Sequence, residues 1–207
     1  MDAVPIVYVV DDEEDARESV RALVASMSMK CQGYASAEEF LEAFDPSLPG
    51  CLVADMRMVG MSGLQLQEEL ARRGHALPVI LVSGFIEVPH AVDAMKAGAR
   101  TVLKKPCRGQ DIWDAIQDAL KQDADNRRSK ARRDEVEGRF NHLTPPEREV
   151  LELIVSGKSN KATAQELAVS VRTVEDRRRS IMRKLEADSF AQLVKLAVEE
   201  QQMAESP

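Results

Sequence analysis

Short apolar runs alternate with amphipathic stretches through residues 6–120, and this alternation limits the possible folds more than any other feature of the chain. Each run has the length of a β-strand, whereas each stretch between runs has the length of a helix. Such alternation predicts an α/β domain in which a doubly wound parallel sheet is covered by helices on both faces. The five predicted strands are Ile6–Val10, Lys30–Tyr34, Cys51–Ala54, Val79–Val82 and Thr101–Lys104. The predicted helices begin near Glu13, Ser36, Ser62, Glu87 and Gln110.

A different pattern follows this α/β region. The segment Lys121–Arg139 carries alternating charges and few large apolar residues, which is typical of an exposed, helical linker. This linker could act as a simple spacer, or its helix could also mediate contacts between two copies of the chain. Beyond it, four helical segments with short breaks predict an all-α four-helix domain. The predicted divisions are an α/β domain over 1–122, the linker over 123–140 and the helical domain over 141–207.

Capping residues divide the helical domain. Thr144, followed by Pro145 and three residues later by Glu147, forms a capping box with a preorganised first turn. Gly157 marks the end of this first helix. The candidate caps of the next three helices are Asn160, Ser170 and Ser189.

Composition excludes several functional classes. No apolar run approaches the roughly 18 residues that a membrane-spanning helix needs, and the N-terminus lacks the basic start of a signal peptide. We therefore expect a cytoplasmic protein with no membrane partner. The three cysteines are far apart and match no metal-ligand spacing, so we expect inert thiols rather than disulfide partners or zinc ligands.

Polar residues follow four of the five predicted strands at the point where each strand ends. They are Asp11 and Asp12, Asp55, Ser83 and Lys105. In an open parallel sheet, ligands bind beyond these carboxyl ends. Carboxylates that converge there repel one another unless a cation joins them, and Mg²⁺ prefers carboxylate oxygens. We predict a Mg²⁺ site with Asp11 and Asp12 as the metal pair and Asp55 as a nucleophile that could form an acyl phosphate. For any one of these acids, a simple helix N-cap is an open alternative.

Residues 5–122 resemble the receiver domain of two-component response regulators, which has a CheY-like or flavodoxin-like fold. The motifs that carry the resemblance are Val9-Val10-Asp11-Asp12-Glu13, Asp55-x-Arg57-Met58-x-Gly60-Met61-Ser62-Gly63, Ser83-Gly84, Ala94-Met95-Lys96-Ala97-Gly98-Ala99 and Lys104-Lys105-Pro106. The resemblance implies that Asp55 accepts phosphate from a sensor histidine kinase. It further implies that Asp12, Asp55 and the backbone carbonyl of Arg57 coordinate Mg²⁺, and that Asp11 contributes through water.

The resemblance also assigns roles around the phosphoryl group. Lys105 would hold the group, Ser83 would sense it, and the Lys105-Pro106 peptide would be cis. Two residues depart from the family pattern. Val102 stands where receivers usually carry an inward-turning Tyr or Phe, which puts the relay of the phosphorylation signal in question. Val59 replaces a common Pro, which is expected to loosen the turn after Asp55.

The helical domain carries a local basic patch. Residues 159–185 have the size of a helix-turn-helix. The second of its helices has an apolar face formed by Val171, Val174, Ile181 and Leu185. Its other face carries Glu175, Asp176, Arg179 and Arg183. Residues 169–185 contain six basic and two acidic side chains in a chain of net charge −7. A face of this kind is often only solvated, but within a helix-turn-helix it predicts binding to DNA phosphates.

Residues 143–203 are similar to LuxR-type DNA-binding domains. The similarity lies in Leu143-Thr144-x-x-Glu147-Arg148-Glu149-Val150-Leu151, Asn160-Lys161-x-Thr163-Ala164-x-x-Leu167, Ser170-Val171-Arg172-Thr173-Val174-Glu175 and Ile181-Met182-x-Lys184-Leu185. With the receiver, this resembles the FixJ/NarL class, and the segment Val88–Val92 with the long linker looks most like the FixJ branch. By resemblance, Glu175, Asp176 and Arg179 approach bases. The other predicted DNA contacts, mainly to phosphates, are Lys161, Arg172, Thr173, Arg178, Arg183 and Lys184.

These features predict a transcription regulator rather than an enzyme, with self-phosphorylation and autodephosphorylation as its only chemistry. Phosphorylation of Asp55 would favour a homodimer that binds a two-fold promoter site and acts on the transcription machinery. The alternatives are a phosphorylation-independent DNA-binding regulator with a vestigial receiver, an aspartyl-phosphate phosphatase, and a ligand-gated LuxR-type sensor.

Overall fold

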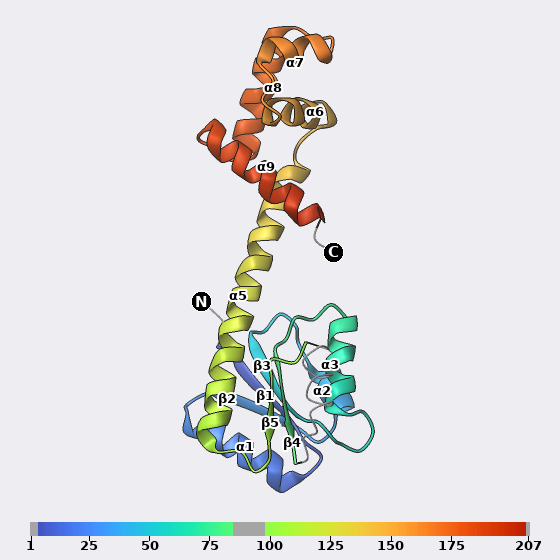
Figure 1. Cartoon of the computed structure of the whole chain (residues 1–207), viewed down its shortest axis with the longest axis vertical. Helices are drawn as coiled ribbons and strands as arrows, with labels where there is room; N and C mark the ends of the chain where they lie inside the picture. Colours follow the sequence, from blue (N-terminus) through green and yellow to red (C-terminus); the bar gives the residue numbers. More distant parts are fainter. Residues whose placement is uncertain (1–3, 85–97, 206–207) are drawn as a thin grey trace. The chain divides into compact units, whose positions relative to one another are not determined.

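The computed structural model describes residues 4–84 and 98–205, which form two compact units, Met1–Arg127 and Arg128–Pro207 (Figure 1). The predicted helix near Glu87 and the segment Val88–Val92 lie outside the described residues. Within the described part, no helix has both the length and the apolar character that would carry it across a membrane.

The first unit is built on a parallel sheet of five strands in the order β2-β1-β3-β4-β5. The strands are β1 (Ile6–Val10), β2 (Lys30–Tyr34), β3 (Gly50–Asp55), β4 (Val79–Ser83) and β5 (Thr101–Lys104). The predicted doubly wound five-stranded sheet is therefore confirmed. β3 and β4 run further than predicted, so that Asp55 and Ser83 are the last residues of their strands.

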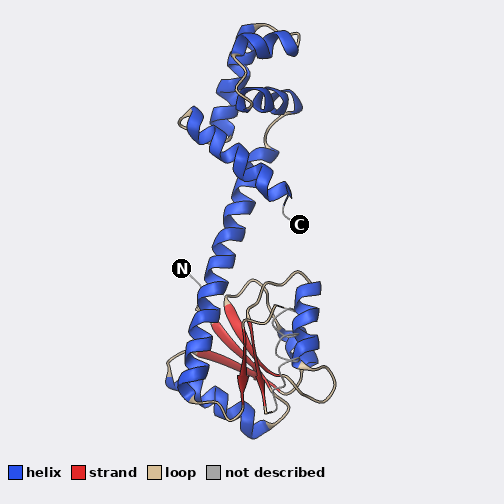
Figure 2. Cartoon of the chain, viewed as in Figure 1, coloured by secondary structure: helices blue, strands red, loops and turns tan. Residues whose placement is uncertain are grey.

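Helices cover both faces of this sheet (Figure 2). On one face lie α1 (Glu14–Ser26) and the first part of α5 (Gly109–Asn141), and on the other lie α2 (Ala37–Ala43) and α3 (Gly63–Arg72). The sequence of β1 explains why both faces of the sheet are covered, because alternate side chains of a strand point to opposite faces. Ile6, Tyr8 and Val10 enter the core under α2 and α3, whereas Val7 and Val9 enter the core under α1 and α5.

Most of the aromatic rings of the first unit lie in the core under α2 and α3. Phe40 packs edge-on against both Tyr8 and Tyr34, at 5.4 and 5.5 Å between ring centroids. Phe44 continues the cluster towards His75. The core on the opposite face is filled by aliphatic side chains and Cys51.

A buried ion pair fastens α5 to the sheet within the first unit. Asp123 is 4% exposed, and its Oδ2 accepts hydrogen bonds from the Gly50 backbone N–H at 3.0 Å and from Arg127 Nε at 2.8 Å. The Arg127 guanidinium also donates to the Ser47 carbonyl at 2.9 Å. This part of α5 therefore contacts the loop that leads into β3.

The second unit contains the four predicted helices and the last turns of α5. The four are α6 (Pro145–Val155), α7 (Asn160–Glu166), α8 (Val171–Lys184) and α9 (Phe190–Glu205). Val136 and Phe140 of α5 are buried in the core of this unit together with Leu151, Ile181 and Leu193. The segment predicted as an exposed linker is thus helical, but it contributes buried side chains to the fold.

One predicted cap is wrong by a residue. Ser159, not Asn160, caps α7, since its hydroxyl accepts the Ala162 N–H at 3.3 Å. Asn160 is the first residue of the helix, and its Oδ1 accepts a hydrogen bond from Arg178 at 2.6 Å. The remaining caps, Thr144, Ser170 and Ser189, begin their helices as predicted.

Candidate functional site

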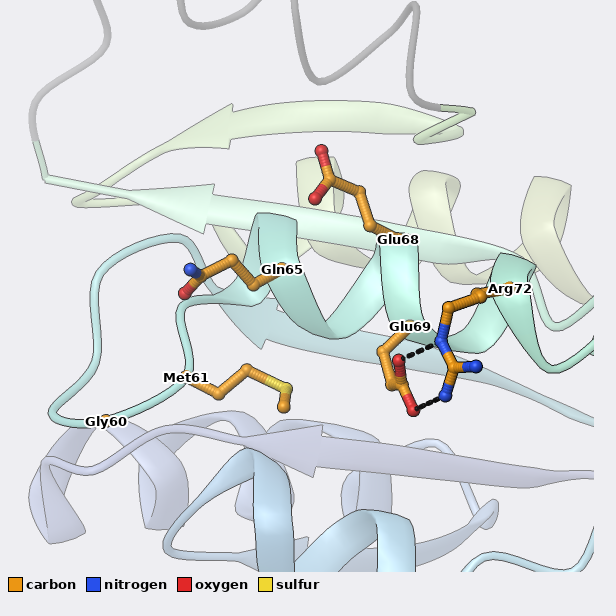
Figure 3. Close-up of a pocket in the computed structure, with 6 residues that line it drawn as sticks. All are labelled: Gly60, Met61, Gln65, Glu68, Glu69 and Arg72. Atoms are coloured by element: carbon orange, nitrogen blue, oxygen red, sulfur yellow. Dashed lines mark hydrogen bonds and ion pairs between the residues drawn. The ribbon is translucent and has the colours of Figure 1, made fainter.

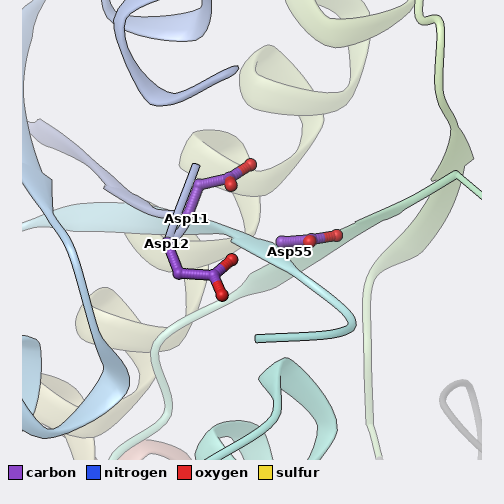
Figure 4. A group of neighbouring side chains, drawn as sticks. All are labelled: Asp11, Asp12 and Asp55. Atoms are coloured by element: carbon purple, nitrogen blue, oxygen red, sulfur yellow. The ribbon is translucent and has the colours of Figure 1, made fainter. Parts of the chain in front are cut away.

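Three carboxylates meet at the carboxyl edge of the sheet. Asp11 and Asp12 follow β1, Asp55 ends the neighbouring β3, and one oxygen of each lies within 4.8 Å of the others (Figure 4). The carboxylates come from adjacent parallel strands because β1 pairs directly with β3. The structure therefore brings together the three acids that the sequence singled out.

Asp11 and Asp55 share one cation, the ammonium of Lys105. Lys105 Nζ lies 2.8 Å from Asp11 Oδ2 and 3.6 Å from Asp55 Oδ1. Burial alone would lower the pKa of Lys105, but the hydrogen bond and charge of Asp11 and the charge of Asp55 raise it, so the ammonium stays charged. Burial raises the pKa of Asp55, which Lys105 opposes and the charge of Asp11 reinforces.

Backbone donors hold each of the carboxylates. The Glu13 N–H donates to Asp11 Oδ1 at 3.0 Å, the Val59 N–H donates to Asp12 Oδ2 at 2.9 Å, and the Arg57 N–H hydrogen-bonds Asp55. The Asp11 carbonyl in turn accepts from Arg17 at 2.7 Å. The loops that carry the acids are therefore tied to one another.

The loop after Asp55 leaves no space for a side chain at Gly63. A Cβ on this residue would lie 2.3 Å from the Asp55 carbonyl oxygen, which is far inside contact distance. Ser62, just before it, caps α3 in a reciprocal capping box with Gln65. The start of α3 is thus packed directly on the backbone of Asp55.

The other predicted residues of this site lie around the same edge. Ser83 is buried, and its carbonyl accepts the Lys105 N–H at 2.8 Å. The Lys105-Pro106 peptide is cis, as the resemblance implied. Val102 pairs with Leu81 across β4 and β5 and is half-buried against the core under α2 and α3.

The residues present fit a magnesium ion. The three carboxylates supply hard oxygen ligands, and Lys105 compensates only part of their negative charge. Mg²⁺ commonly binds proteins through one or two carboxylates together with phosphate oxygens. Receiver domains generally bind Mg²⁺ at an acidic cluster of this kind.

A separate pocket of about 420 Å³ lies beside α3 (Figure 3). It is lined by Gly60, Met61, Gln65, Glu68, Glu69 and Arg72. Glu69 makes ion pairs with Arg72 and Arg73, both at 2.7 Å, which lower its pKa to about 2. None of the predicted site residues lines this pocket, and two of its charged side chains, Glu69 and Arg72, are already paired with each other.

In the second unit, α7 and α8 form the predicted helix-turn-helix. Val174, Ile181 and Leu185 are buried, which confirms the apolar face of α8, whereas Val171 at its first turn is exposed. Six of the predicted DNA-contacting side chains are exposed: Lys161, Arg172, Glu175, Asp176, Arg179 and Arg183. Asp176 and Arg179 form an exposed ion pair at 3.0 Å.

The other three predicted DNA contacts are half-buried and have partners within the unit. Lys184 Nζ donates to Glu147 Oε2 at 2.6 Å, so this ammonium joins α8 to the start of α6. Arg178 lies over the Phe190 ring at 5.4 Å and donates to Asn160. The Thr173 hydroxyl lies 2.8 Å from that of Ser170. The sequence indicated only capping roles for Glu147 and Asn160. Nothing in it revealed that they accept hydrogen bonds from Lys184 and Arg178 of α8.

An acidic cluster with a neighbouring lysine at the edge of a parallel sheet, in one chain with a helix-turn-helix, defines the class of response regulators. Residues 7–117 match the family described as response regulator receiver domain, and residues 141–197 match the family described as bacterial regulatory proteins, luxR family. The chain belongs to the response regulators that join a receiver to a LuxR-type DNA-binding domain, and it resembles their FixJ branch.

Individual relatives agree with this assignment. The transcriptional regulatory protein FixJ of Azorhizobium caulinodans is 41% identical over 93% of this chain and 91% of its own length. The response regulator TodT of Pseudomonas putida is 36% identical over 94% of this chain and 86% of its own. The solved structure of the response regulator StyR superposes with a TM-score of 0.88, at 40% identity, over 95% of this chain and 100% of its own. The chain is therefore a transcription regulator, whose domains imply DNA and a histidine kinase as partners.

Proposed function

We propose that a histidine kinase phosphorylates Asp55 and that this modification controls dimerisation and sequence-specific DNA binding. The observation that carries the proposal is the placement of Lys105 Nζ between Asp11 and Asp55, in a cluster of three carboxylates. Such a cluster holds more negative charge than its lysine neutralises, which suits it to a cation and a phosphoryl group together.

The proposed chemistry requires little of the protein beyond positioning. A carboxylate oxygen of Asp55 attacks the phosphorus of a phosphohistidine, and the bond from phosphorus to the histidine nitrogen breaks as the acyl phosphate forms. The electron pair of that bond stays on the departing imidazole. Lys105 is placed to stabilise the phosphoryl oxygens, while Asp11 and Asp12 would hold Mg²⁺ with Asp55. When bound, Mg²⁺ neutralises the charge on the transferring group. Loss of the phosphoryl group to water reverses the modification.

The DNA-binding part of the proposal depends on which basic side chains are free to reach DNA. Lys161, Arg172 and Arg183 are exposed and suited to phosphates. Glu175, Asp176 and Arg179 project from α8 and are the candidates for base contacts. Arg178 and Lys184 would instead act mainly through the helices that they hold together. Dimerisation would present two such surfaces to the half-sites of a two-fold promoter site, where the protein acts on the transcription machinery.

Asp55→Asn is expected to abolish phosphorylation, because an amide oxygen is a poor nucleophile and the variant keeps the size of the side chain. Wild type incubated with Mg²⁺ and a small phosphodonor should gain the mass of one phosphoryl group, form a dimer on a sizing column and bind selected DNA more tightly. The variant should do none of these. Asp45→Asn, which changes an exposed acid in a loop away from the cluster, is the control.

Three outcomes would reject the proposal. Phosphorylation of Asp55→Asn would place the modification elsewhere. Equal DNA binding by unphosphorylated and phosphorylated wild type would instead favour the phosphorylation-independent regulator, in which the receiver is vestigial. Sustained hydrolysis of a phosphomonoester would favour a phosphatase.

Arg179→Ala is expected to weaken binding to DNA selected from a random pool by about tenfold, the usual effect of losing one base contact of 1–3 kcal/mol. The ion pair that it breaks with Asp176 is exposed, so the fold should be retained. Fluorescence anisotropy at fixed salt measures the affinity. Arg108→Ala, which removes an exposed arginine of the first unit, is the matched control. Equal losses in the two variants would mean that the effect is one of net charge alone.

A further inference from the structure

The outer face of α8 carries an acidic side chain within a stripe of arginines. Four exposed residues follow one another at spacings of four, three and four positions, which places them on the same side of the helix: Arg172, Asp176, Arg179 and Arg183. The buried residues of α8 lie on the opposite side. The stripe is therefore the part of α8 that faces outwards, and Asp176 sets a negative charge in the middle of it.

Asp176 could pair with an arginine on either side, and it pairs with Arg179. Arg172 lies four residues before it and Arg179 three residues after it, and both spacings allow contact on a helix. Arg179 Nη1 donates to Asp176 Oδ1 at 3.0 Å. The side chains of Arg179 and Asp176 are 80% and 58% exposed, so the pair takes little part in packing. Exposed pairs of this kind contribute little to stability, so its effect should lie in how the two groups meet DNA.

The ion pair leaves Arg179 able to bind a base. A guanidinium has several N–H donors in one plane, and Asp176 occupies one end of them. The donors that remain are enough for two parallel hydrogen bonds to O6 and N7 of a guanine, the usual partner of arginine in the major groove. The carboxylate also offsets the positive charge that would otherwise draw Arg179 to any phosphate within reach.

We propose that Asp176 is a positioning residue that directs Arg179 to a guanine rather than to a phosphate, an inference that rests on the proposed DNA contacts of α8. The pair strengthens when DNA excludes water from it, because charges attract more strongly where the local dielectric is low. The phosphates would repel an acid without a partner, so the arginine also makes Asp176 tolerable beside DNA. The flanking Arg172 and Arg183 remain suited to phosphates.

Fluorescence anisotropy of the full chain, with Mg²⁺ and a small phosphodonor present throughout, tests this role. The probe is the duplex that wild type selects from a random pool. The guanine bound by Arg179 is the one whose replacement by adenine weakens wild type about tenfold but has no effect on Arg179→Ala. In Asp176→Ala, the same replacement should weaken binding by less than about threefold. The slope of log affinity against log salt for a scrambled duplex should steepen by about one, because the freed Arg179 can contact a phosphate.

Asp188→Ala is the matched control, since it removes the same charge from an exposed acid just beyond α8. This variant should keep the full preference for guanine. An undiminished preference in Asp176→Ala, or a salt slope equal to that of wild type, would overturn the inference. A preference lost to the same extent in Asp188→Ala would reduce the effect to net charge and also reject it. If every replacement weakens wild type and Arg179→Ala alike, the base contact of the proposed function itself is wrong, and the role of Asp176 falls with it.

Discussion

Asp123→Ala is expected to lower the free energy of unfolding of the first unit by about 3 kcal/mol, the low end of the cost of breaking a buried ion pair. The substitution leaves the Gly50 N–H without its acceptor and removes the charge that faces Arg127. Arg127 keeps its backbone acceptors, among them the Ser47 carbonyl, which is why the lower end applies. Urea unfolding monitored by hydrogen exchange of the β1 and β3 amides measures the loss.

Asp118→Ala provides the control for this prediction. Asp118 lies on the same helix, its side chain is 70% exposed, and its ion pair with Arg100 is long, at 3.9 Å. Its removal should cost less than about 0.5 kcal/mol. Similar losses of unfolding free energy in the two variants would contradict the prediction. They would show that the contact of Asp123 with the loop before β3 adds no stability beyond the effect of a negative charge on α5.

Glu147→Ala is expected to destabilise the second unit by about 3 kcal/mol. Glu147 is 6% exposed, closes the capping box with Thr144 and pairs with Lys184. Burial alone would raise its pKa, but hydrogen bonds from Lys184, Ser180 and Thr144 lower it to about 2. The difference from the ordinary value of 4.5 corresponds to roughly 3 kcal/mol.

The sign of this shift gives a pH dependence. Because the pKa of Glu147 is lower in the folded state, its stabilising contribution is complete above about pH 4.5 and is lost as the pH falls towards about 2. Methyl NMR signals of Ile154 and Ile181, both buried in this unit, can monitor its unfolding across that range. Glu147→Ala should remove this part of the acid sensitivity. Glu152→Ala, an exposed change on the same helix, should leave it intact, and equal pH profiles for wild type and Glu147→Ala would contradict the assignment.

The sequence predicted the first unit well because its strands are short and apolar and its site residues follow them directly. Asp11, Asp12 and Asp55 could be placed together from one rule, that parallel strands end at the same edge. The hydrogen bond from the Val59 N–H to Asp12 could not be predicted, since every residue except proline carries an N–H and only the folded loop shows where it points.

The sequence pattern also could not predict which side chains of different helices contact one another. Glu147 and Lys184 lie 37 positions apart, and their meeting depends on how α6 crosses α8. From the sequence, Lys184 therefore could not be distinguished from the other basic residues of α8. Asn160 and Ser159 are both good caps by residue type, and only the structure shows that Ser159 caps α7 while Asn160 accepts a hydrogen bond from Arg178.

The uneven placement of aromatic rings has a practical consequence for spectroscopy. The chain has two tyrosines and one tryptophan, and Tyr8, Tyr34 and Trp113 all belong to the first unit. The DNA-binding unit has phenylalanine as its only aromatic chromophore besides histidine. Fluorescence of tyrosine and tryptophan thus reports on the receiver alone, as does near-ultraviolet dichroism at the longer wavelengths where phenylalanine does not absorb. Far-ultraviolet dichroism reports on both units. Denaturation curves from the two kinds of signal need not coincide, and their separation would measure how independently the two units unfold.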